Sequence, residues 1–234
     1  MEPLSFDNII RKYQFTFHRV VDFDPATDRL CALDFTRNNT ELTPDKMRYA
    51  LTDYVQRKVH ASNSRYGIGG YNEHRTIYSI SNVFDGKQPN EEPRRLHLGV
   101  DIWGPVGTPV YAFMGGMVHS FAFNDQPGDY GATLILLHQL DGVAFYTLYG
   151  HLSLRDIQNV SAGQYVSIGQ TIAHFGDQRE NGHWPPHLHF QIILDMQLKE
   201  GDYPGVCKFS ERDKYLANCP DPDLILQLNR YIKQ

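Results

Sequence analysis

The sequence is poor in the residues that would cross-link a fold or hold it in a membrane. Its 234 residues include three cysteines, Cys31, Cys207 and Cys219, which are too few and too scattered for a disulfide framework or a cysteine-type zinc site. We expect free thiols, since a bridge between Cys207 and Cys219 would need an oxidising compartment. No apolar run is long enough to span a membrane, so we expect no membrane partner.

The sequence also lacks an excess of positive charge. It holds 22 lysines and arginines against 27 aspartates and glutamates, a net charge of −5 at pH 7. Proteins that bind nucleic acid neutralise phosphates with clustered basic side chains, so we expect no nucleic-acid partner. The first eight residues, MEPLSFDN, have neither the basic start nor the apolar stretch of a secretory signal. The expected location is therefore cytoplasmic, and the oligomeric state is left open.

The residues that are present have an ordinary globular composition. Hydrophobic residues make up 41% of the chain and charged residues 21%, which excludes a disordered or collagen-like protein. A chain of 234 residues suits one domain with an appendage. We predict a mainly β fold, α+β overall, in which a compact antiparallel β-sheet domain carries a small mixed N-terminal segment and a C-terminal helix.

Residues 1–64 are predicted to form the N-terminal segment. Apolar runs at 15–21 and 30–35 flank a turn-rich stretch and indicate a hairpin. Thr43 followed by Pro44 is typical of a helix start, and the apolar spacing predicts a helix over about 44–60. The packed face of this helix is expected to hold Met47, Leu51, Tyr54 and Val55. The segment either covers a sheet edge or caps a groove of the main domain.

Residues 65–234 are predicted to form the main domain, because glycines, aromatics and short apolar runs are typical of antiparallel β proteins. We place strands at 109–113, 117–118, 134–137, 143–146, 171–173 and 189–193. Asp141-Gly142 indicates a tight hairpin turn between two of them, because both residue types accept a positive φ. A terminal helix is expected after Pro222, with Leu224, Ile225 and Leu228 available for packing.

Four polar residues stand in two closely spaced pairs. His97 and Asp101 are four positions apart and His187 and His189 are two apart, so each pair shares one face of an extended strand. Two such pairs on neighbouring strands would converge on one ion, and two histidines with a carboxylate and an open position form the ligand shell of a catalytic zinc. Zinc activates a bound water and polarises a carbonyl, which serves amide hydrolysis. His151, in the sequence YGHLS, is the natural residue for proton transfer.

The order of these residues resembles that of the lysostaphin-like (LytM-type) zinc endopeptidases, which have the duplicated-hybrid-motif fold. The marks of that family are a His-x-x-x-Asp motif, an isolated His after a strand and a late His-x-His, and they occur here at 97–101, 151 and 187–189. Connecting stretches such as GTPVYA at 107–112 and VSIGQTIA at 166–173 are also similar. The resemblance covers residues 90–194, the motif core, and leaves 195–234 as a C-terminal extension.

This resemblance implies a zinc-dependent metalloendopeptidase. His97, Asp101 and His189 would bind one Zn²⁺, and His151 and His187 would be the catalytic histidines beside it. The implied substrate is a peptide or peptidoglycan with Gly- or Ala-containing links, held in a groove over the metal.

The stretch NGHWPP at 181–186 replaces the small residues that usually precede the last motif, and it would reshape one wall of the groove. Trp184, Tyr149 and His183 are therefore candidate substrate-binding residues, with a packing or structural role as the alternative for each. A narrow groove around Trp184 would favour a different function, the hydrolysis of a small non-wall amide. A further alternative is a non-catalytic zinc-containing binding or regulatory module, although modules of that type lose ligands and none is lost here.

The remaining histidines favour no second site. A structural role is the simpler interpretation for any single histidine, and the five motif residues indicate a metal site only because they occur together. The histidines without a partner at ligand spacing are His18, His60, His119, His138 and His174.

Overall fold

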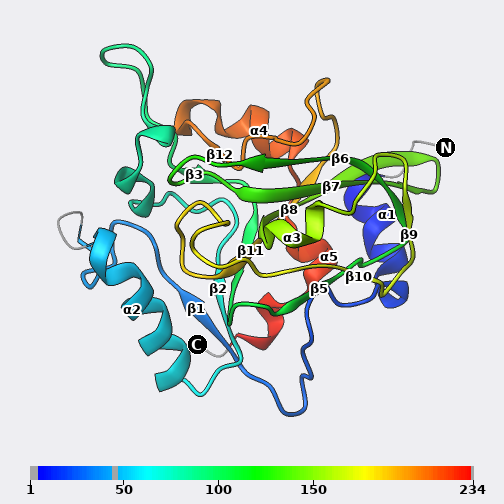
Figure 1. Ribbon diagram of the computed structural model, residues 1–234, viewed down its shortest axis with the longest axis horizontal. Coiled ribbons are helices and arrows are strands. Elements are labelled where there is room, and N and C mark those ends of the chain that lie inside the picture. The colour runs from blue at the N-terminus through cyan, green and yellow to red at the C-terminus, as the bar shows by residue number, and fades with distance from the viewer. Residues whose placement is uncertain (1–4, 44–46, 233–234) are drawn as a thin grey trace.

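The computed structural model describes residues 5–43 and 47–232, and its centre is one eight-stranded sheet (Figure 1). In order across the sheet, the strands are β1 (Leu30–Leu33), β2 (Tyr66–Gly69), β4 (Val100–Trp103), β11 (His187–Ile193), β8 (Val143–Leu152), β7 (Gly131–Leu140), β6 (Gly116–Asn124) and β9 (Tyr165–Val166). The β1–β2 pair is parallel, and the other described neighbours are antiparallel. The predicted mainly β, antiparallel domain is confirmed.

Two small sheets and several short helices complete the described chain. β5 (Pro109–Tyr111) pairs with β10 (Thr171–His174), and β3 (Leu96–His97) pairs with β12 (Val206–Cys207). The α-helices are α1 (Phe6–Tyr13), α2 (Met47–Ala61), α3 (Leu154–Ile157), α4 (Arg212–Asn218) and α5 (Asp223–Leu226). The 3₁₀-helices are η1 (Gln14–Thr16), η2 (Ile77–Ile80), η3 (Asn82–Phe84), η4 (Phe209–Glu211) and η5 (Asn229–Tyr231). Each of the six predicted strands coincides with an observed one, and no helix within the described ranges is long and apolar enough to cross a membrane.

The predicted N-terminal hairpin is wrong. Between η1 and β1 the chain forms no strand, and β1 pairs in parallel with β2, with Leu30 opposite Tyr66. Apolar residues of the run at 15–21 are buried without forming a strand, since Val20 and Val21 pack in the main core. The carbonyl of Val20 also accepts a hydrogen bond from the backbone N–H of Tyr111. Burial in the core therefore takes the place of the expected strand partner.

The first 64 residues share the core of the main domain. Ile10 of α1 and Phe23 belong to the same hydrophobic cluster as Phe190 of β11. β1 forms one edge of the large sheet, and α2 packs against β1 and β2, as Figure 1 shows. This arrangement favours the alternative in which the segment covers a sheet edge, while the domain boundary after residue 64 stays a prediction.

The second predicted helix is confirmed as α2. Leu51, Tyr54 and Val55 lie on one face of it and are buried. The expected helix start at Pro44 and the packing of the Met47 side chain lie outside the described residues.

The turn at Asp141-Gly142 forms as predicted between β7 and β8. Both residues have a positive φ, 49° and 81°, which is the backbone geometry of a tight two-residue hairpin. The Asp141 carboxylate accepts hydrogen bonds from Lys12 Nζ at 2.7 Å and from Tyr13 Oη at 2.6 Å. These two contacts fasten α1 to the tip of the hairpin.

The C-terminal region also contributes residues to the main hydrophobic core. The predicted terminal helix is confirmed as α5, and Leu224, Ile225 and Leu228 are buried. Cys207 and Cys219 are both buried and free, so no disulfide joins them in this structure.

Candidate metal and active site

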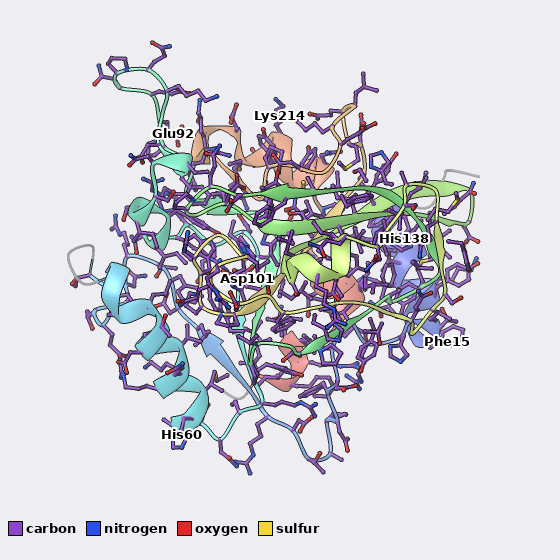
Figure 2. The ribbon with its side chains drawn as sticks, viewed as in Figure 1. Phe15, His60, Glu92, Asp101, His138 and Lys214 are labelled. Carbon is purple, nitrogen blue, oxygen red and sulfur yellow. The ribbon has the colours of Figure 1, made fainter. Side chains whose placement is uncertain are left out.

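Three buried side chains bring their donor atoms together near the middle of the molecule, where Figure 2 labels Asp101. His97 Nε2 lies 3.0 Å from His189 Nδ1 and 3.2 Å from Asp101 Oδ1. His189 Nδ1 lies 3.0 Å from the same carboxylate oxygen. Each of the three residues is at most 3% exposed. The predicted ligand set therefore converges on one point.

Pairing between β4 and β11 places two of the three donors. The strands are antiparallel neighbours, with Asp101 directly opposite His189. His187 lies opposite Trp103 in the same register, two residues along and on the same side of the strand as His189. Asp101 and the His187/His189 pair therefore lie on adjacent strands as predicted, whereas His97 belongs to β3, which is in another sheet.

The predicted shared face of His97 and Asp101 on one strand is wrong. The chain leaves β3 after His97 and enters β4 at Val100, and the two strands belong to different sheets. A straight strand would hold residues four apart about 13 Å from each other, too far to share an ion. The bend at Leu98-Gly99 therefore makes the ligand pair.

Gly99 makes room for His189 at this bend. A Cβ at position 99 would lie 2.5 Å from His189 Cε1 and 2.9 Å from the carbonyl oxygen of Phe190. Because the imidazole lies between Asp101 on one side and Gln191 on the other, it has little freedom to move away. A glycine is required here by close approach.

We expect the substitution Gly99→Ala to lower zinc affinity at least about tenfold, as other displacements of a ligand histidine do. The added methyl group would displace the His189 ring, whose Cε1 and Nε2 it would meet at 2.5 and 2.6 Å. Competition with a chromophoric chelator measures the dissociation constant. Gly70→Ala is the matched control, because a Cβ there would meet only Glu73 atoms at 3.9 Å or more. Equal zinc affinity in the two variants would contradict the close-packing argument.

The hydrogen-bond network assigns the protons of the ligand histidines. His97 Nδ1 lies 2.8 Å from the carbonyl of Gly70 and must donate to it. His189 Nε2 lies 2.9 Å from Gln191 Oε1, while the amide nitrogen of Gln191 donates to the Pro204 carbonyl. His189 Nε2 therefore carries the proton. His97 Nε2 and His189 Nδ1 are the ring nitrogens that face each other and the Asp101 carboxylate.

This donor set fits a zinc ion. Burial lowers the pKa of His97 to about 4, so its imidazole is neutral at pH 7. Burial alone would raise the pKa of Asp101, but the interactions with His97 and Arg75 outweigh it and hold that pKa well below its ordinary range. The neutral His97 ring, the Nδ1 of His189 and the ionised Asp101 carboxylate bring three metal-ligand atoms to one point. Donors about 3 Å apart can share an ion at about 2.0–2.2 Å from each, with a fourth position open.

His151 and His187 stand beside the three donors as a close pair of rings tilted by 31°. Their ring centroids are 4.0 Å apart, and the His187 ring stacks on Trp103 at 3.8 Å. His151 Nδ1 donates to the Asn181 carbonyl and His187 Nδ1 to the Pro185 carbonyl, each at 2.8 Å. Both Nε2 atoms are therefore unprotonated. Burial lowers the pKa of His187 to about 4 and that of His151 well below its ordinary value, so both rings are neutral.

A β-bulge aims His151 at the site. In the β7–β8 pair, Ala132 lies opposite Leu152 and Leu134 opposite Tyr149, so two residues of β8 face one of β7. His151 is one of the two, and its φ is +62°, a left-handed backbone that non-glycine residues seldom adopt. Such strain concentrates at functional positions, where surrounding contacts hold it in place.

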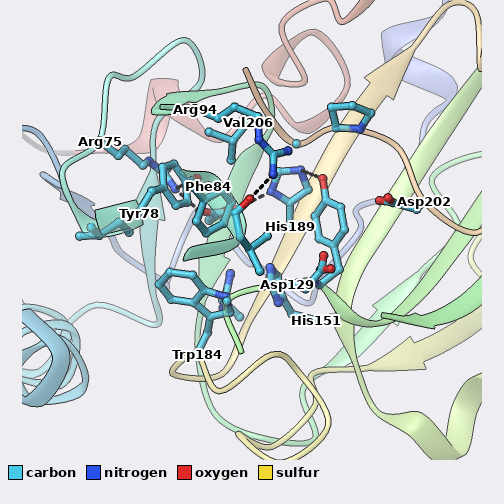
Figure 3. Close-up of a pocket in the computed structure, with 18 of the residues that line it drawn as sticks. Arg75, Tyr78, Phe84, Arg94, Asp129, His151, Trp184, His189, Asp202 and Val206 are labelled. Atoms are coloured by element: carbon cyan, nitrogen blue, oxygen red, sulfur yellow. Dashed lines mark hydrogen bonds and ion pairs between the residues drawn. The ribbon is translucent and has the colours of Figure 1, made fainter. Parts of the chain in front are cut away.

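Four of the five motif residues, Asp101, His151, His187 and His189, line an inner pocket with two different walls. Tyr78, Phe84 and Trp184 form an aromatic wall, and Asp129 and Asp202 lie on the other side (Figure 3). The cavity holds about 120 Å³. It adjoins a wider outer groove of about 1250 Å³, and both share Trp184 in their lining.

The predicted substrate-binding residues divide among three environments. Trp184 lines the inner pocket and His183 the outer groove. Tyr149 is fully buried and packs on Phe190 in the core, so the prediction that it contacts substrate is wrong. It lies opposite Phe190 in the register of β8 and β11, and both side chains belong to the main hydrophobic cluster.

Described residues of the N-terminal segment do not line the inner pocket. Leu51 and Thr52 of α2 reach the outer groove only. The aromatic wall comes instead from η2, η3 and the stretch 181–186. Among the described residues of the first 64, only Leu51 and Thr52 line the outer groove, and the groove-cap alternative stays a prediction.

Sequence reasoning missed two residues that shape the site. Asn181 is fully buried, accepts from Trp184 N through its side chain and receives His151 Nδ1 on its carbonyl. Arg75 is buried against Asp101, with Nη1 2.5 Å from Oδ2. Neither stands at a spacing that suggests a ligand or a catalytic group. The polar stretch Glu73-His74-Arg75 after two glycines is the one sequence feature near Arg75 that could have drawn attention.

Comparison with known proteins covers this same part of the chain. The family model described as Peptidase family M23 matches residues 95–200. The DD-carboxypeptidase/endopeptidase Mpg of Neisseria meningitidis is 34% identical over 134 residues, 55% of this chain and 28% of that protein. The peptidoglycan DD-endopeptidase ShyC of Vibrio cholerae is 34% identical over 116 residues, 45% of this chain and 24% of that protein.

Lysostaphin supplies both a sequence and a structural comparison. The Staphylococcus simulans protein is 36% identical over 100 residues, 43% of this chain and 18% of its own length. Its crystallised catalytic domain is 28% identical, covers 57% of this chain and 80% of that domain, and has a TM-score of 0.39. This chain spans less than a third of the length of each of the three curated relatives. The sequence matches confirm the predicted resemblance to lysostaphin-like endopeptidases, and the matched range contains all five motif residues.

Proposed function

We propose that this chain, whose residues 95–200 match Peptidase family M23, is a zinc-dependent endopeptidase. The observation that carries the proposal is the convergence of His97, Asp101 and His189, whose donor atoms lie within 3.2 Å of one another. Two neutral histidines with free Nε2 atoms line the same pocket. A metal site with a purely structural role would not require two further histidines with free Nε2 atoms in the same pocket.

The three donors would hold the zinc, which when bound supplies a Lewis acid that polarises the scissile carbonyl and lowers the pKa of a water molecule. His151 and His187 handle protons. Each ring has its Nδ1 proton committed to a backbone carbonyl, so Nε2 is the atom that takes up a proton. Once protonated, that atom can donate to the developing oxyanion or to the leaving amine. The stacking of His187 on Trp103 keeps its ring in one orientation.

The proposed substrate is a peptide of the peptidoglycan type, with Gly or Ala at the cleaved bond. A cavity of about 120 Å³, lined by four of the five motif residues, leaves room only for small side chains there. The outer groove of about 1250 Å³ accommodates further residues of an extended chain. Relatives named DD-endopeptidase and lysostaphin support this substrate class.

Mass spectrometry of digests tests the proposal. Zinc-loaded protein is incubated with peptidoglycan and with Gly- and Ala-rich peptides, and the same preparation stripped by a chelator is the control. We expect new peptide termini with the zinc-loaded protein, none after stripping, and recovery on adding zinc back. Binding of peptidoglycan without any cleavage would support a binding module instead. Cleavage restricted to short amides would favour the small-amide hydrolase, in keeping with the narrow space beside Trp184.

A further inference from the structure

Arg75 is a buried cation in direct contact with the candidate metal site. It lies between β2 and η2, and only 1% of it is exposed. Its Nη1 donates to Asp101 Oδ2 at 2.5 Å and to Tyr78 Oη at 3.2 Å. Its Nε donates to Glu73 Oε2 at 2.7 Å, and its Nη2 to the Gly70 carbonyl at 3.2 Å. All three nitrogens of the guanidinium are therefore engaged.

The contact divides the two oxygens of Asp101 between different partners. Oδ1 faces His97 Nε2 and His189 Nδ1, at 3.2 and 3.0 Å. Oδ2 belongs to the ion pair with Arg75. A carboxylate held in this way cannot rotate about its Cβ–Cγ bond without breaking a short, charge-assisted hydrogen bond.

Arg75 itself is fixed by its surroundings. The guanidinium lies 5.1 Å from the ring of Phe35 and 5.8 Å from that of Tyr78. Glu73 holds its Nε and is held in turn by the backbone N–H of Phe35, 3.4 Å from Oε1. A Cβ at Gly69 would lie 2.7 Å from Arg75 Nη2, so the backbone of β2 also limits its movement. Figure 3 shows Arg75 entering the pocket from the side of Tyr78.

Burying a guanidinium is costly unless charges and hydrogen bonds compensate it. Glu73 alone would neutralise the charge of Arg75. The second carboxylate partner, Asp101, adds a contact that neutralisation does not require, and this contact lies on the one oxygen that the histidines do not use.

We propose that Arg75 is a positioning residue for the metal: it holds Asp101 so that Oδ1 alone is offered to the ion and Oδ2 stays out of the coordination sphere. Glu73 supports this role by fixing the guanidinium. The fourth position is then kept for substrate and water rather than taken by the second oxygen of the aspartate. The inference rests on the metal site of the proposed function, but it concerns metal binding and can be measured without turnover.

Zinc affinity and cobalt spectroscopy test this role. Zinc dissociation constants are measured by chelator competition, and visible absorption of the Co²⁺-loaded protein reports the coordination geometry. We expect Arg75→Met to weaken zinc binding by about 10–100-fold, the range for losing a partner of a metal ligand. The Co²⁺ bands should shift at the same time, because Asp101 gains freedom to bind through both oxygens. The zinc affinity of Arg75→Lys should lie between those of the wild type and Arg75→Met. One ammonium group can keep the contact with Asp101 but cannot donate to all four acceptors of the guanidinium.

Arg95→Met is the matched control. The Arg95 side chain is also largely buried. It pairs with Asp85 at 2.7 Å and donates to the backbone carbonyls of Phe84 and Arg94, none of which belongs to a donor residue. Its replacement should leave zinc affinity and Co²⁺ bands unchanged. If Arg75→Met does not fold, Glu73→Gln takes its place, with a smaller expected loss of zinc affinity, because it loosens Arg75 without removing it.

The outcomes separate this inference from the proposed function. Wild-type zinc affinity and Co²⁺ bands in Arg75→Met, or in Glu73→Gln if that variant is used, would overturn the positioning role while leaving the peptidase intact. Failure of the wild-type protein to bind zinc would overturn both. Zinc binding by the wild type that is weakened in Arg75→Met and spared in Arg95→Met would support the inference even if no peptide is cleaved.

Discussion

Replacing His187 with alanine is expected to lower the kcat of peptide cleavage by about 10²–10⁴-fold, the usual loss when a general acid or base is removed. Zinc should stay bound, because the three donor atoms belong to other residues. The reason lies in the protonation of the ring: Nδ1 is committed to the Pro185 carbonyl, and the free Nε2 belongs to a residue that lines the pocket. Initial rates on the peptide identified by mass spectrometry, with zinc content measured on the same samples, check this result.

His138→Ala is the matched control for the loss of a buried imidazole. His138 is 1% exposed and bonds the Gly115 carbonyl and Thr147, away from the site. It should cost stability but leave the kcat of the folded protein unchanged. Undiminished cleavage in His187→Ala would exclude a catalytic role for that residue. Loss of zinc together with cleavage would mean that His187 supports the metal site instead.

Asp101→Asn is expected to weaken zinc binding by more than about 100-fold. This exceeds the loss of affinity, about 10–100-fold, that follows when a residue supporting a metal ligand is removed. The substitution keeps the shape of the side chain and removes the one negative charge among the three donors. It also leaves Arg75 facing a neutral amide. Breaking a buried ion pair typically costs about 3–5 kcal/mol, and we expect the lower end because Glu73 still pairs with Arg75.

Two measurements separate these effects. Chelator competition gives the zinc affinity, and urea unfolding of the metal-free protein gives the change in stability without the contribution of bound zinc. Asp156→Asn is a suitable control, because Asp156 pairs with His174 outside the site. Zinc affinity within a few-fold of wild type in Asp101→Asn would contradict the assignment of this residue as a ligand.

Local patterns predicted much of the fold because their causes lie within a few residues. The hairpin at Asp141-Gly142 needs only two residues that accept positive φ, and both adopt it. The apolar face of α2 likewise follows from helical spacing, as the burial of Leu51, Tyr54 and Val55 shows. The prediction of an N-terminal hairpin was wrong because an apolar run indicates only that its residues are buried, not that they pair with a strand. Val20 and Val21 are buried without pairing with a strand.

The site was predicted in part for the same reason. His187 and His189 share a face because β11 is a continuous strand. His97 and Asp101 come together for a different reason, because the chain bends at Gly99 between two sheets. Their order in the sequence was nevertheless sufficient to identify them. Tyr149 was misplaced because nothing in the sequence states which side of β8 faces the pocket, and the bulge at His151 changes the alternation there.

By itself, the sequence determined the class of fold and the identity of the five polar residues, because strand patterning and ligand chemistry each restrict residue types at short spacing. The tertiary structure alone decided how the donors meet, what covers the pocket and what holds Asp101. Arg75 reaches Asp101 across 26 positions, and His189 reaches it across 88. Contacts between residues so far apart in the sequence form only when the whole core packs. They therefore depend on the strands and helices that lie between them in the chain, and no local pattern predicts them.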